Sequence, residues 1–319
     1  MKNKPILIFA GQENSVFFEI FFKSLKKNKY KTPLILVASV KQLKKEMKKH
    51  NFKRNINLYT LKSLQNQKLK NKEINLINIE DTLYKNFRSK KNDYVNKGFD
   101  ICFKILKSGY SKKFINGPIN KSQFLNRKHL GITEFVSKKF KIKNTAMLIY
   151  NKDLSVCPIT THLPLKLVTK KITKKLIKDK AFLIDDFFRK NFGFRPKIAV
   201  TGLNPHCESI LKFNEDKKII SPAINSLKKI GINIDGPFSA DTIFLKQNRK
   251  KYDVILGMYH DQVLTPLKTL KEYDAINITL GLPFLRVSPD HGPNKKMINK
   301  NLSNPLSLLQ SIKFLDKLC

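Results

Sequence analysis

The sequence predicts an α/β fold, because short apolar runs alternate along the chain with segments of helical periodicity. Residues 254–256 and 275–280 are apolar with little alternation, which is typical of buried strands in a parallel sheet covered on both faces. Over 93–108 apolar side chains instead recur every three or four positions, as on one face of a helix. At 319 residues the chain is long for a small single domain, so we expect two lobes.

The first part of the chain contains five expected strands and four expected helices. The strands are short β-branched or apolar runs bounded by turn residues, at 5–11, 34–38, 56–61, 74–79 and 114–121, the last running into a turn. The helices have apolar residues at helical spacing, at 16–27, 40–49, 93–108 and 133–140. Glu134 near the start of the last helix is favoured there by the helix dipole.

The remainder continues the same alternation. We expect strands at 146–150, 155–160, 197–202, 242–246, 254–256 and 275–280. A single long basic helix is expected over 163–192, with Pro164 in its first turn and Gly193 at its end. Further helices are expected over 222–229, with Ser221 as the cap, and over 306–318.

The chain is strongly basic, with 63 Lys and Arg against 24 Asp and Glu and a formal net charge of +39. Most of this charge is lysine spread over the whole sequence, on what we interpret as solvated helix faces. We therefore expect the charge to steer phosphorylated, anionic substrates rather than to bind a specific nucleic acid. A polyanion-binding protein on a catalytically inactive scaffold is the distant alternative.

The sequence favours a cytoplasmic protein. No run approaches 18 apolar residues, so no membrane span is expected, and the apolar run at 6–10 is too short for a secretory signal. The four cysteines show no CxxC pairing, which fits free thiols in a reducing compartment.

Three of the six histidines follow predicted strands: His162, His206 and His260. Ligands of open α/β sheets bind beyond the carboxyl ends of the strands. A single histidine in such a place is more often a polar residue satisfied within the fold. Three in equivalent places, without metal-type cysteines, favour a shared three-histidine metal site with an open coordination position.

Seven ordered motifs carry a family resemblance, between about residues 117 and 292. They are GPINK (117–121), GITEF (131–135), THLPLK (161–166), TGLNPH (201–206), GPFSADTIF (236–244), MYHDQ (258–262) and NITLGLPFLRVSPDHG (277–292). With these motifs the sequence resembles the family of 4-hydroxythreonine-4-phosphate dehydrogenase, the NAD-dependent enzyme of vitamin B6 biosynthesis.

The resemblance implies two α/β/α lobes like those of isocitrate and isopropylmalate dehydrogenases, with the active site in the interlobe cleft. One lobe would comprise residues 1–125 together with 286–319. The other, 126–285, would carry the metal histidines and the contacts of a homodimer. The implied reaction is the NAD- or NADP-dependent oxidation of 4-phosphooxy-L-threonine to 2-amino-3-oxo-4-phosphooxybutanoate, which decarboxylates to 3-amino-2-oxopropyl phosphate.

The resemblance also implies roles for individual residues. One divalent metal ion per site, zinc, magnesium or cobalt, would be held by His162, His206 and His260 drawn from both subunits. The implied substrate contacts are Thr133, Lys268, Asn277 and Arg286. Asp261 is a candidate catalytic residue, and Asp241, Asp261 and Asp290 are candidates for orienting the histidines.

The residue chemistry agrees with these roles. A divalent ion on neutral imidazoles lowers the pKa of a bound hydroxyl, which favours hydride loss to the nicotinamide. Lys268 and Arg286 supply the positive charge that a phosphorylated substrate requires. The alternative interpretation is that Lys268 is an ordinary surface lysine and that Arg286 is an arginine in a structural salt bridge. Thr133 could equally be an ordinary helix N-terminal residue, and Asn277 in an apolar strand would need a partner even if only structural.

Three departures from the family pattern concern the ligands. The glycine-rich opening turn is reduced to its first glycine at 11–17, Ile132 stands where the family has a histidine, and residues 293–296 replace the usual small residues. Ile132 leaves open a related dehydrogenase that acts on another phosphorylated hydroxy acid. No Gly-x-Gly-x-x-Gly pattern is present, so the cofactor-binding residues and the choice of NAD or NADP stay open.

Overall fold

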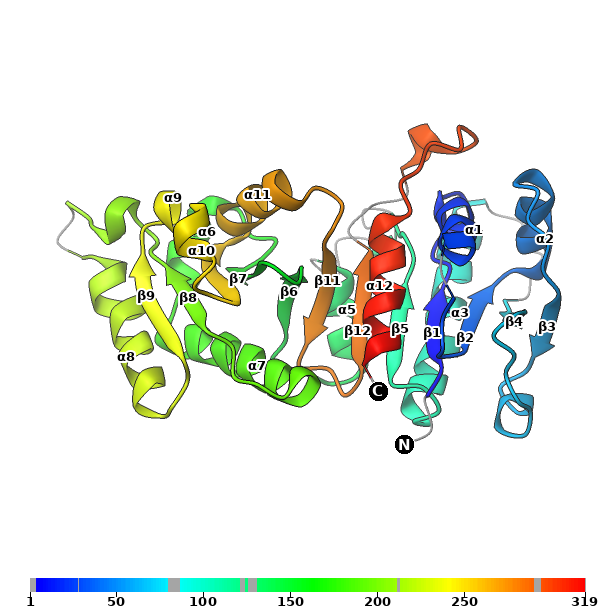
Figure 1. Ribbon diagram of the computed structural model, residues 1–319, viewed down its shortest axis with the longest axis horizontal. Coiled ribbons are helices and arrows are strands. Elements are labelled where there is room, and N and C mark those ends of the chain that lie inside the picture. The colour runs from blue at the N-terminus through cyan, green and yellow to red at the C-terminus, as the bar shows by residue number, and fades with distance from the viewer. Residues whose placement is uncertain are drawn as a thin grey trace. The chain divides into compact units, whose positions relative to one another are not determined.

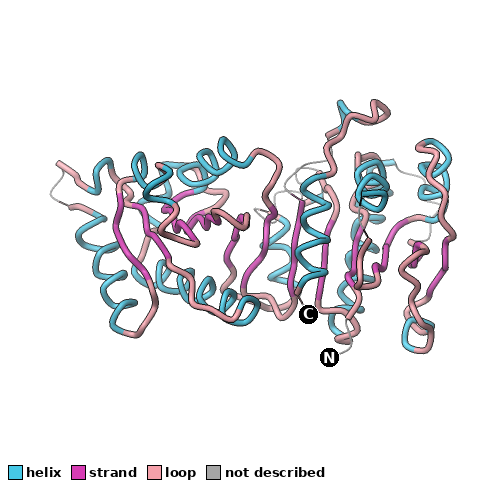
Figure 2. Tube along the Cα trace, viewed as in Figure 1, coloured by secondary structure: helices cyan, strands magenta, loops and turns pink. Residues whose placement is uncertain are grey.

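The computed structural model describes residues 4–27, 29–79, 87–120, 124–125, 131–210, 213–289 and 294–318. The chain divides into two compact units, 1–132 with 283–319, and 133–282. Each unit contains a sheet and flanking helices, and the two kinds of element alternate along the trace (Figures 1 and 2). The predicted α/β class is confirmed.

The first unit is built on a parallel sheet of six strands. They are β1 (Ile6–Phe9), β2 (Leu34–Ala38), β3 (Ile56–Tyr59), β4 (Ile74–Asn78), β5 (Lys113–Asn116) and β12 (Leu285–Pro289), in the order β3-β4-β2-β1-β5-β12. Every residue of β1 is buried, as expected for a central parallel strand. The strand β12 was not predicted, because its sequence LRVSP carries a charge and a proline.

Helices pack against this sheet through aromatic side chains. They are α1 (Phe17–Lys27), α2 (Val40–Lys49), α3 (Phe87–Lys107) and α12 (Leu306–Lys317), with short 3-10 turns at Ser63–Gln65 and Lys295–Met297. In the view of Figure 1, α12 lies in front of the sheet and α3 behind it. Phe99 of α3 meets Phe9 of β1 edge to face at 5.2 Å between ring centres. Among the helices described, none is long and apolar enough to cross a bilayer.

The second unit has a mixed sheet. Its strands are β6 (Ala146–Tyr150), β7 (Ser155–Thr160), β8 (Ile198–Thr201), β9 (Ile234–Phe238), β10 (Val254–Tyr259) and β11 (Ile276–Leu280), in the order β11-β6-β7-β10-β8-β9. β7, β10, β8 and β9 are parallel, whereas β6 runs antiparallel to both β7 and β11. The expectation of purely parallel pairing was therefore wrong for β11. Because β6 is reversed, β11 still points in the same direction as β7.

The helices of the second unit correct three expectations. They are α5 (Ile132–Lys139), α6 (Leu165–Lys171), α7 (Lys174–Phe192), α8 (Ser221–Lys229), α9 (Ala240–Ile243), α10 (Lys246–Arg249) and α11 (His260–Lys271), with a 3-10 turn η2 (Pro205–Cys207) and a π-helical turn η3 (Asp216–Ile220).

The predicted helix over 163–192 is two helices, because Ile172 is extended and the Thr173 side chain accepts a hydrogen bond from Leu176 N, which starts α7. The predicted strand over 242–246 is instead the end of α9, the turn that follows it and the first residue of α10. Ser221 does not cap α8, since the helix continues from η3 and its hydroxyl donates to the Asp216 carbonyl at 2.8 Å.

Candidate metal and substrate site

The three candidate metal ligands follow three neighbouring parallel strands of the second unit. His162 lies two residues after β7, His260 is the first residue of α11 after β10, and His206 lies in η2 after β8. These strands are adjacent in the order β7-β10-β8. All three histidines therefore stand at the same edge of one sheet, the edge where ligands of such sheets bind.

His162 and His260 face each other. Their ring centres are 6.0 Å apart and the ring planes are inclined by 39°. Two imidazoles bound to one ion through nitrogens at about 2.1 Å have ring centres roughly 5 to 6 Å apart. His260 Nδ1 lies 2.7 Å from Asp261 Oδ1, which leaves Nε2 as the metal-binding atom. The spacing of the rings and the Asp261 carboxylate on His260 Nδ1 fit a divalent metal ion.

The start of α11 is held in place by a glycine and an amide. A side chain at Gly257 in β10 would come within 2.2 Å of Val263 Cγ1, so glycine lets the helix pack directly on the strand end. Gln262 Oε1 accepts from Met258 N at 2.7 Å and from the Thr201 hydroxyl at 2.8 Å, and Nε2 donates to the Gly202 carbonyl at 2.8 Å. Gln262 thus ties the end of β8 to the turn that carries His260.

His206 occupies a strained turn. His206 has φ 54° and Cys207 has φ 61°, two consecutive non-glycine residues in the left-handed region. Such conformations cost roughly 1–3 kcal/mol each and are concentrated at functional sites. The Asp216 carboxylate holds the turn by accepting from Leu203 N at 2.8 Å and from Asn204 Nδ2 at 2.8 Å. This strain supports a functional role for His206.

Asp241 lies near His206, and its pKa is lowered chiefly by the Ser239 hydroxyl and further by the His206 charge. The carboxyl group stays ionised beside the third candidate ligand. Asp290, the remaining predicted carboxylate, lies outside the described residues.

One chain brings two of the three histidines together. Among the residues that the structure describes, no group of three His, Cys, Asp or Glu side chains is arranged to hold a metal ion. His206 therefore does not complete a three-ligand set with His162 and His260 within a single chain.

A cavity of about 110 Å³ lies against His162. Thr133 and Glu134 line it from α5 and Lys180 lines it from α7. Thr145 and Thr161 are also part of its polar lining. The Lys180 ammonium donates to the Thr145 carbonyl, and burial lowers the pKa of Lys180, partly offset by the charges of Cys157, Asp179 and Glu134. Sequence reasoning missed Lys180, because its helix reads as one uniformly basic surface.

The other candidate substrate residues are distributed over both units. In the second unit, Asn277 lies in β11 and Lys268 in the last turn of α11. The Asn277 Oδ1 atom is buried and has no hydrogen-bond partner within the described ranges, so it is open to a ligand or water. Arg286 of β12 belongs to the first unit, is 2% exposed, and donates from Nε to Asn116 Oδ1 at 2.9 Å. Ile132 is buried.

The altered turn at 11–17 is held by side chains. Gly11 has φ 82°, and a Cβ there would come within 2.4 Å of the Pro118 carbonyl oxygen, so this glycine is required. Gln12 Oε1 accepts from Asn120 N at 2.7 Å, and Ser15 Oγ accepts from Phe17 N at 3.4 Å at the start of α1. The turn is thus joined to the end of β5 without the remaining glycines.

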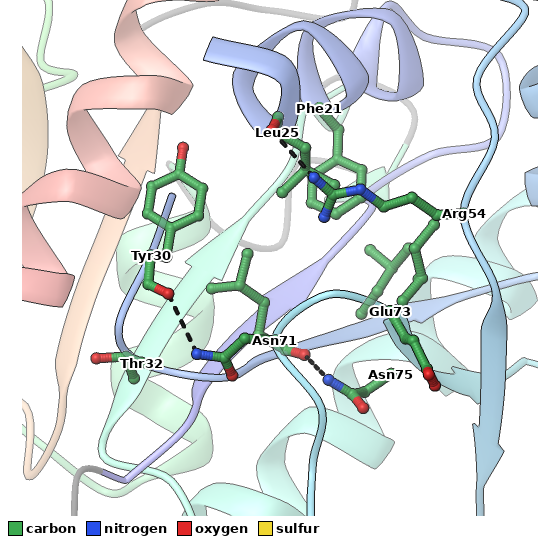
Figure 3. A pocket seen from close by; sticks show the side chains of 11 residues that line it. Phe21, Leu25, Tyr30, Thr32, Arg54, Asn71, Glu73 and Asn75 are labelled. Carbon is green, nitrogen blue, oxygen red and sulfur yellow. Dashed lines mark hydrogen bonds between the residues drawn. The ribbon is translucent and has the colours of Figure 1, made fainter. Parts of the chain in front are cut away.

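A second cavity, in the first unit, is too small for a substrate. It has a volume of about 20 Å³, room for about one water. Arg54 on its wall donates to the Leu25 carbonyl at 3.2 Å, and Asn71 donates to the Tyr30 carbonyl at 3.1 Å (Figure 3).

Comparison with known proteins gives consistent matches. A family model described as pyridoxal phosphate biosynthetic protein PdxA matches residues 29–315. A 4-hydroxythreonine-4-phosphate dehydrogenase of Sulfurihydrogenibium sp. is 36% identical over 315 residues, which cover 96% of each chain. One from Bradyrhizobium diazoefficiens is 36% identical over 221 residues, 67% of this chain and 64% of that one. The crystal structure of the enzyme of that name from Klebsiella pneumoniae superposes with a TM-score of 0.83 at 27% identity, covering 98% of each chain.

Proposed function

The chain belongs to the family of the pyridoxal phosphate biosynthetic protein PdxA, and we propose that it oxidises 4-phosphooxy-L-threonine with a nicotinamide cofactor. The product, 2-amino-3-oxo-4-phosphooxybutanoate, decarboxylates to 3-amino-2-oxopropyl phosphate on the route to pyridoxine 5'-phosphate. The family membership bears out the resemblance seen in the sequence. It favours neither a dehydrogenase for another hydroxy acid nor a non-catalytic polyanion-binding protein.

The facing imidazoles of His162 and His260 are the observation that carries the mechanism. They would hold one divalent ion, zinc, magnesium or cobalt, through Nε2. When bound, this ion would lower the pKa of the substrate hydroxyl. Asp261 holds the proton of His260 on Nδ1, so that Nε2 keeps its lone pair for the ligand role. NAD or NADP would supply the hydride acceptor.

Lys268 and Arg286 are each proposed as residues that bind the substrate phosphate, and Thr133 and Asn277 as neutral substrate contacts. The buried Arg286 guanidinium is oriented by Asn116, which suits a planar, two-point contact with an oxyanion. The unsatisfied Asn277 Oδ1 can accept a hydrogen bond from a ligand ammonium or hydroxyl group.

We further propose that His206 comes from a second copy of the chain, in a homodimer with shared metal sites. Two observations support this arrangement. A three-ligand group is lacking within the described part of one chain. Close after His206, Ile210 is fully exposed and Phe213 is 55% exposed, an apolar surface suited to a protein partner.

The two units are proposed to be the two lobes that the resemblance implies. The proposed location is the cytoplasm, where NAD and phosphorylated intermediates are available. The reaction itself requires neither a nucleic acid nor a membrane.

Turnover of 4-phosphooxy-L-threonine tests the function. We expect NADH or NADPH to form with this substrate, to stop after treatment with a chelator, and to return when zinc, cobalt or magnesium is added back. Turnover that is unaffected by complete metal removal would refute the proposed mechanism. Turnover only of a different phosphorylated hydroxy acid would refute the proposed substrate.

A further inference from the structure

We propose that Glu134 is a positioning residue that orients His162, keeping the proton on Nδ1 and leaving Nε2 free to bind the metal. This inference rests on the proposed function, because it takes His162 to be a metal ligand. Sequence reasoning had assigned Glu134 only a favourable place in the helix dipole.

The carboxylate faces the correct side of the imidazole. Glu134 lies in the first turn of α5, and its Oε1 atom is 4.0 Å from His162 Nδ1. That distance is too long for a direct hydrogen bond, but both side chains line the 110 Å³ cavity, which has room for a bridging water. The contact therefore forms through one water, or directly after a small rotation of the ring.

The second carboxylate oxygen shows that Glu134 is not satisfied by its surroundings. Glu134 Oε2 is buried and has no hydrogen-bond partner in the part of the chain that the structure describes. Leaving a buried acceptor unpaired costs roughly 1–3 kcal/mol, more if the group is charged. A carboxylate retained in such a place beside a metal ligand is better explained by a role than by packing.

The other facing histidine also has a carboxylate on its Nδ1 side, at closer range. His260 Nδ1 lies 2.7 Å from Asp261 Oδ1, compared with 4.0 Å between His162 Nδ1 and Glu134 Oε1. Metal-bound histidines commonly donate their second ring N–H to such a group, which fixes the ring and raises its basicity. The two carboxylates come from different elements, α5 and α11, so they are not a by-product of one local turn.

Lys180 supplies a counter-charge for this carboxylate. It lines the same cavity from α7, and the Glu134 charge raises the Lys180 pKa, although burial lowers it by more. The cation thus offsets part of the cost of keeping a carboxylate in a partly enclosed place.

The test is the substitution Glu134→Gln, which preserves shape and removes the charge. We expect the dissociation constant for Zn²⁺ or Co²⁺, measured by competition with a chromophoric chelator, to rise about 10- to 100-fold. The His162 Nδ1 proton, followed by ¹⁵N-imidazole NMR of the zinc-loaded protein, should exchange with water faster than in the unsubstituted protein. Glu272→Gln, at an exposed glutamate, is the matched control and should change neither quantity. Melting of the metal-free proteins checks the fold.

His162→Ala in the same assay separates the two hypotheses. If His162→Ala binds metal as tightly as the unsubstituted protein, the proposed metal site is wrong. If His162→Ala weakens binding while Glu134→Gln leaves both the affinity and the Nδ1 proton unchanged, only the role of Glu134 is refuted.

Discussion

Buried polar side chains differ in whether the chain itself satisfies them. Glu19 is 4% exposed, and both of its oxygens are used: Oε1 accepts from Lys23 Nζ at 2.8 Å and Ser303 N at 2.7 Å, and Oε2 from the Ser303 hydroxyl at 3.0 Å. By contrast, Asn277 Oδ1 and Glu134 Oε2 are buried without a partner among the described residues. The first pattern is that of a structural residue, and the second leaves an acceptor open to a ligand or water.

Glu19→Gln should therefore destabilise the protein in a pH-dependent way. Burial raises the pKa of Glu19, but Lys23 and Ser303 outweigh it, so the pKa lies below its ordinary value. A lowered pKa gives stability that is complete above the unfolded value of about 4.3 and is lost as the pH falls through the lower folded value. We expect a loss of about 1–3 kcal/mol at pH 7 in urea unfolding, shrinking below about pH 4.

The control for this prediction is Glu46→Gln. Glu46 is paired with Lys49 at the surface at 3.2 Å, so this change should cost less than about 1 kcal/mol. A Glu19→Gln deficit that stays constant from pH 7 to pH 3 would contradict the assigned cause.

Arg286→Lys tests the substrate side of the site. Lysine keeps the charge but loses the planar fork that Asn116 orients. The KM for the phosphorylated substrate should rise about 10- to 100-fold, the loss expected for one or two charged hydrogen bonds, while metal affinity stays unchanged. Arg195→Lys, at an exposed arginine that contacts the Gly231 carbonyl, is the control. An unaltered KM would show that Arg286 does not contact the substrate.

At the scale of elements, the sequence predicted best the strands that matter most for the site. β10 is almost wholly buried and reads as an apolar run, and β7 was recognised although its sequence SVCPIT contains a proline, because its centre is apolar; the histidines were placed correctly after the ends of both strands. β9 and β12 were missed because each contains a charged residue, Asp235 or Arg286, in addition to a proline. The direction of β6 depends on its short turn to β7, which an apolar run does not encode.

The contacts that complete the site could not be predicted in the same way. The approach of Glu134 to His162 joins α5 to the end of β7, and Lys180 reaches the same cavity from α7. Neither Glu134 nor Lys180 is close to His162 along the chain, so only tertiary packing brings these side chains together. The break between α6 and α7 was missed because apolar spacing continues across it.

Thr173→Ala tests the start of α7. The Thr173 hydroxyl accepts from Leu176 N at 3.1 Å, and loss of such a cap costs about 1 kcal/mol of stability. Urea unfolding should show this loss, whereas Thr169→Ala on the exposed face of α6 should leave stability within about 0.5 kcal/mol. Equal effects of the two substitutions would mean that the cap does not define the helix start.

At the scale of the whole molecule, the net charge of +39 by itself would suggest a polyanion-binding protein, whereas the family membership indicates a dehydrogenase. The family match is the more specific observation. Lysines dispersed over helix faces attract anions without selecting one. We instead assign the selection of a phosphorylated hydroxy acid to the proposed substrate residues Thr133, Lys268, Asn277 and Arg286. The central claim is that His162 and His260 of one chain share a metal ion with His206 of a second chain.

Mixed dimers test this claim most directly. His162→Ala and His206→Ala chains, carrying different tags, are co-expressed, and the tags are used to measure heterodimer content. Each variant alone should lack turnover and retained metal. A heterodimer contains one site with all three histidines intact, so a random mixture should regain about a quarter of the unsubstituted activity. If the tagged heterodimer forms but stays inactive, or if either variant alone retains metal and turnover, the shared three-histidine site is wrong.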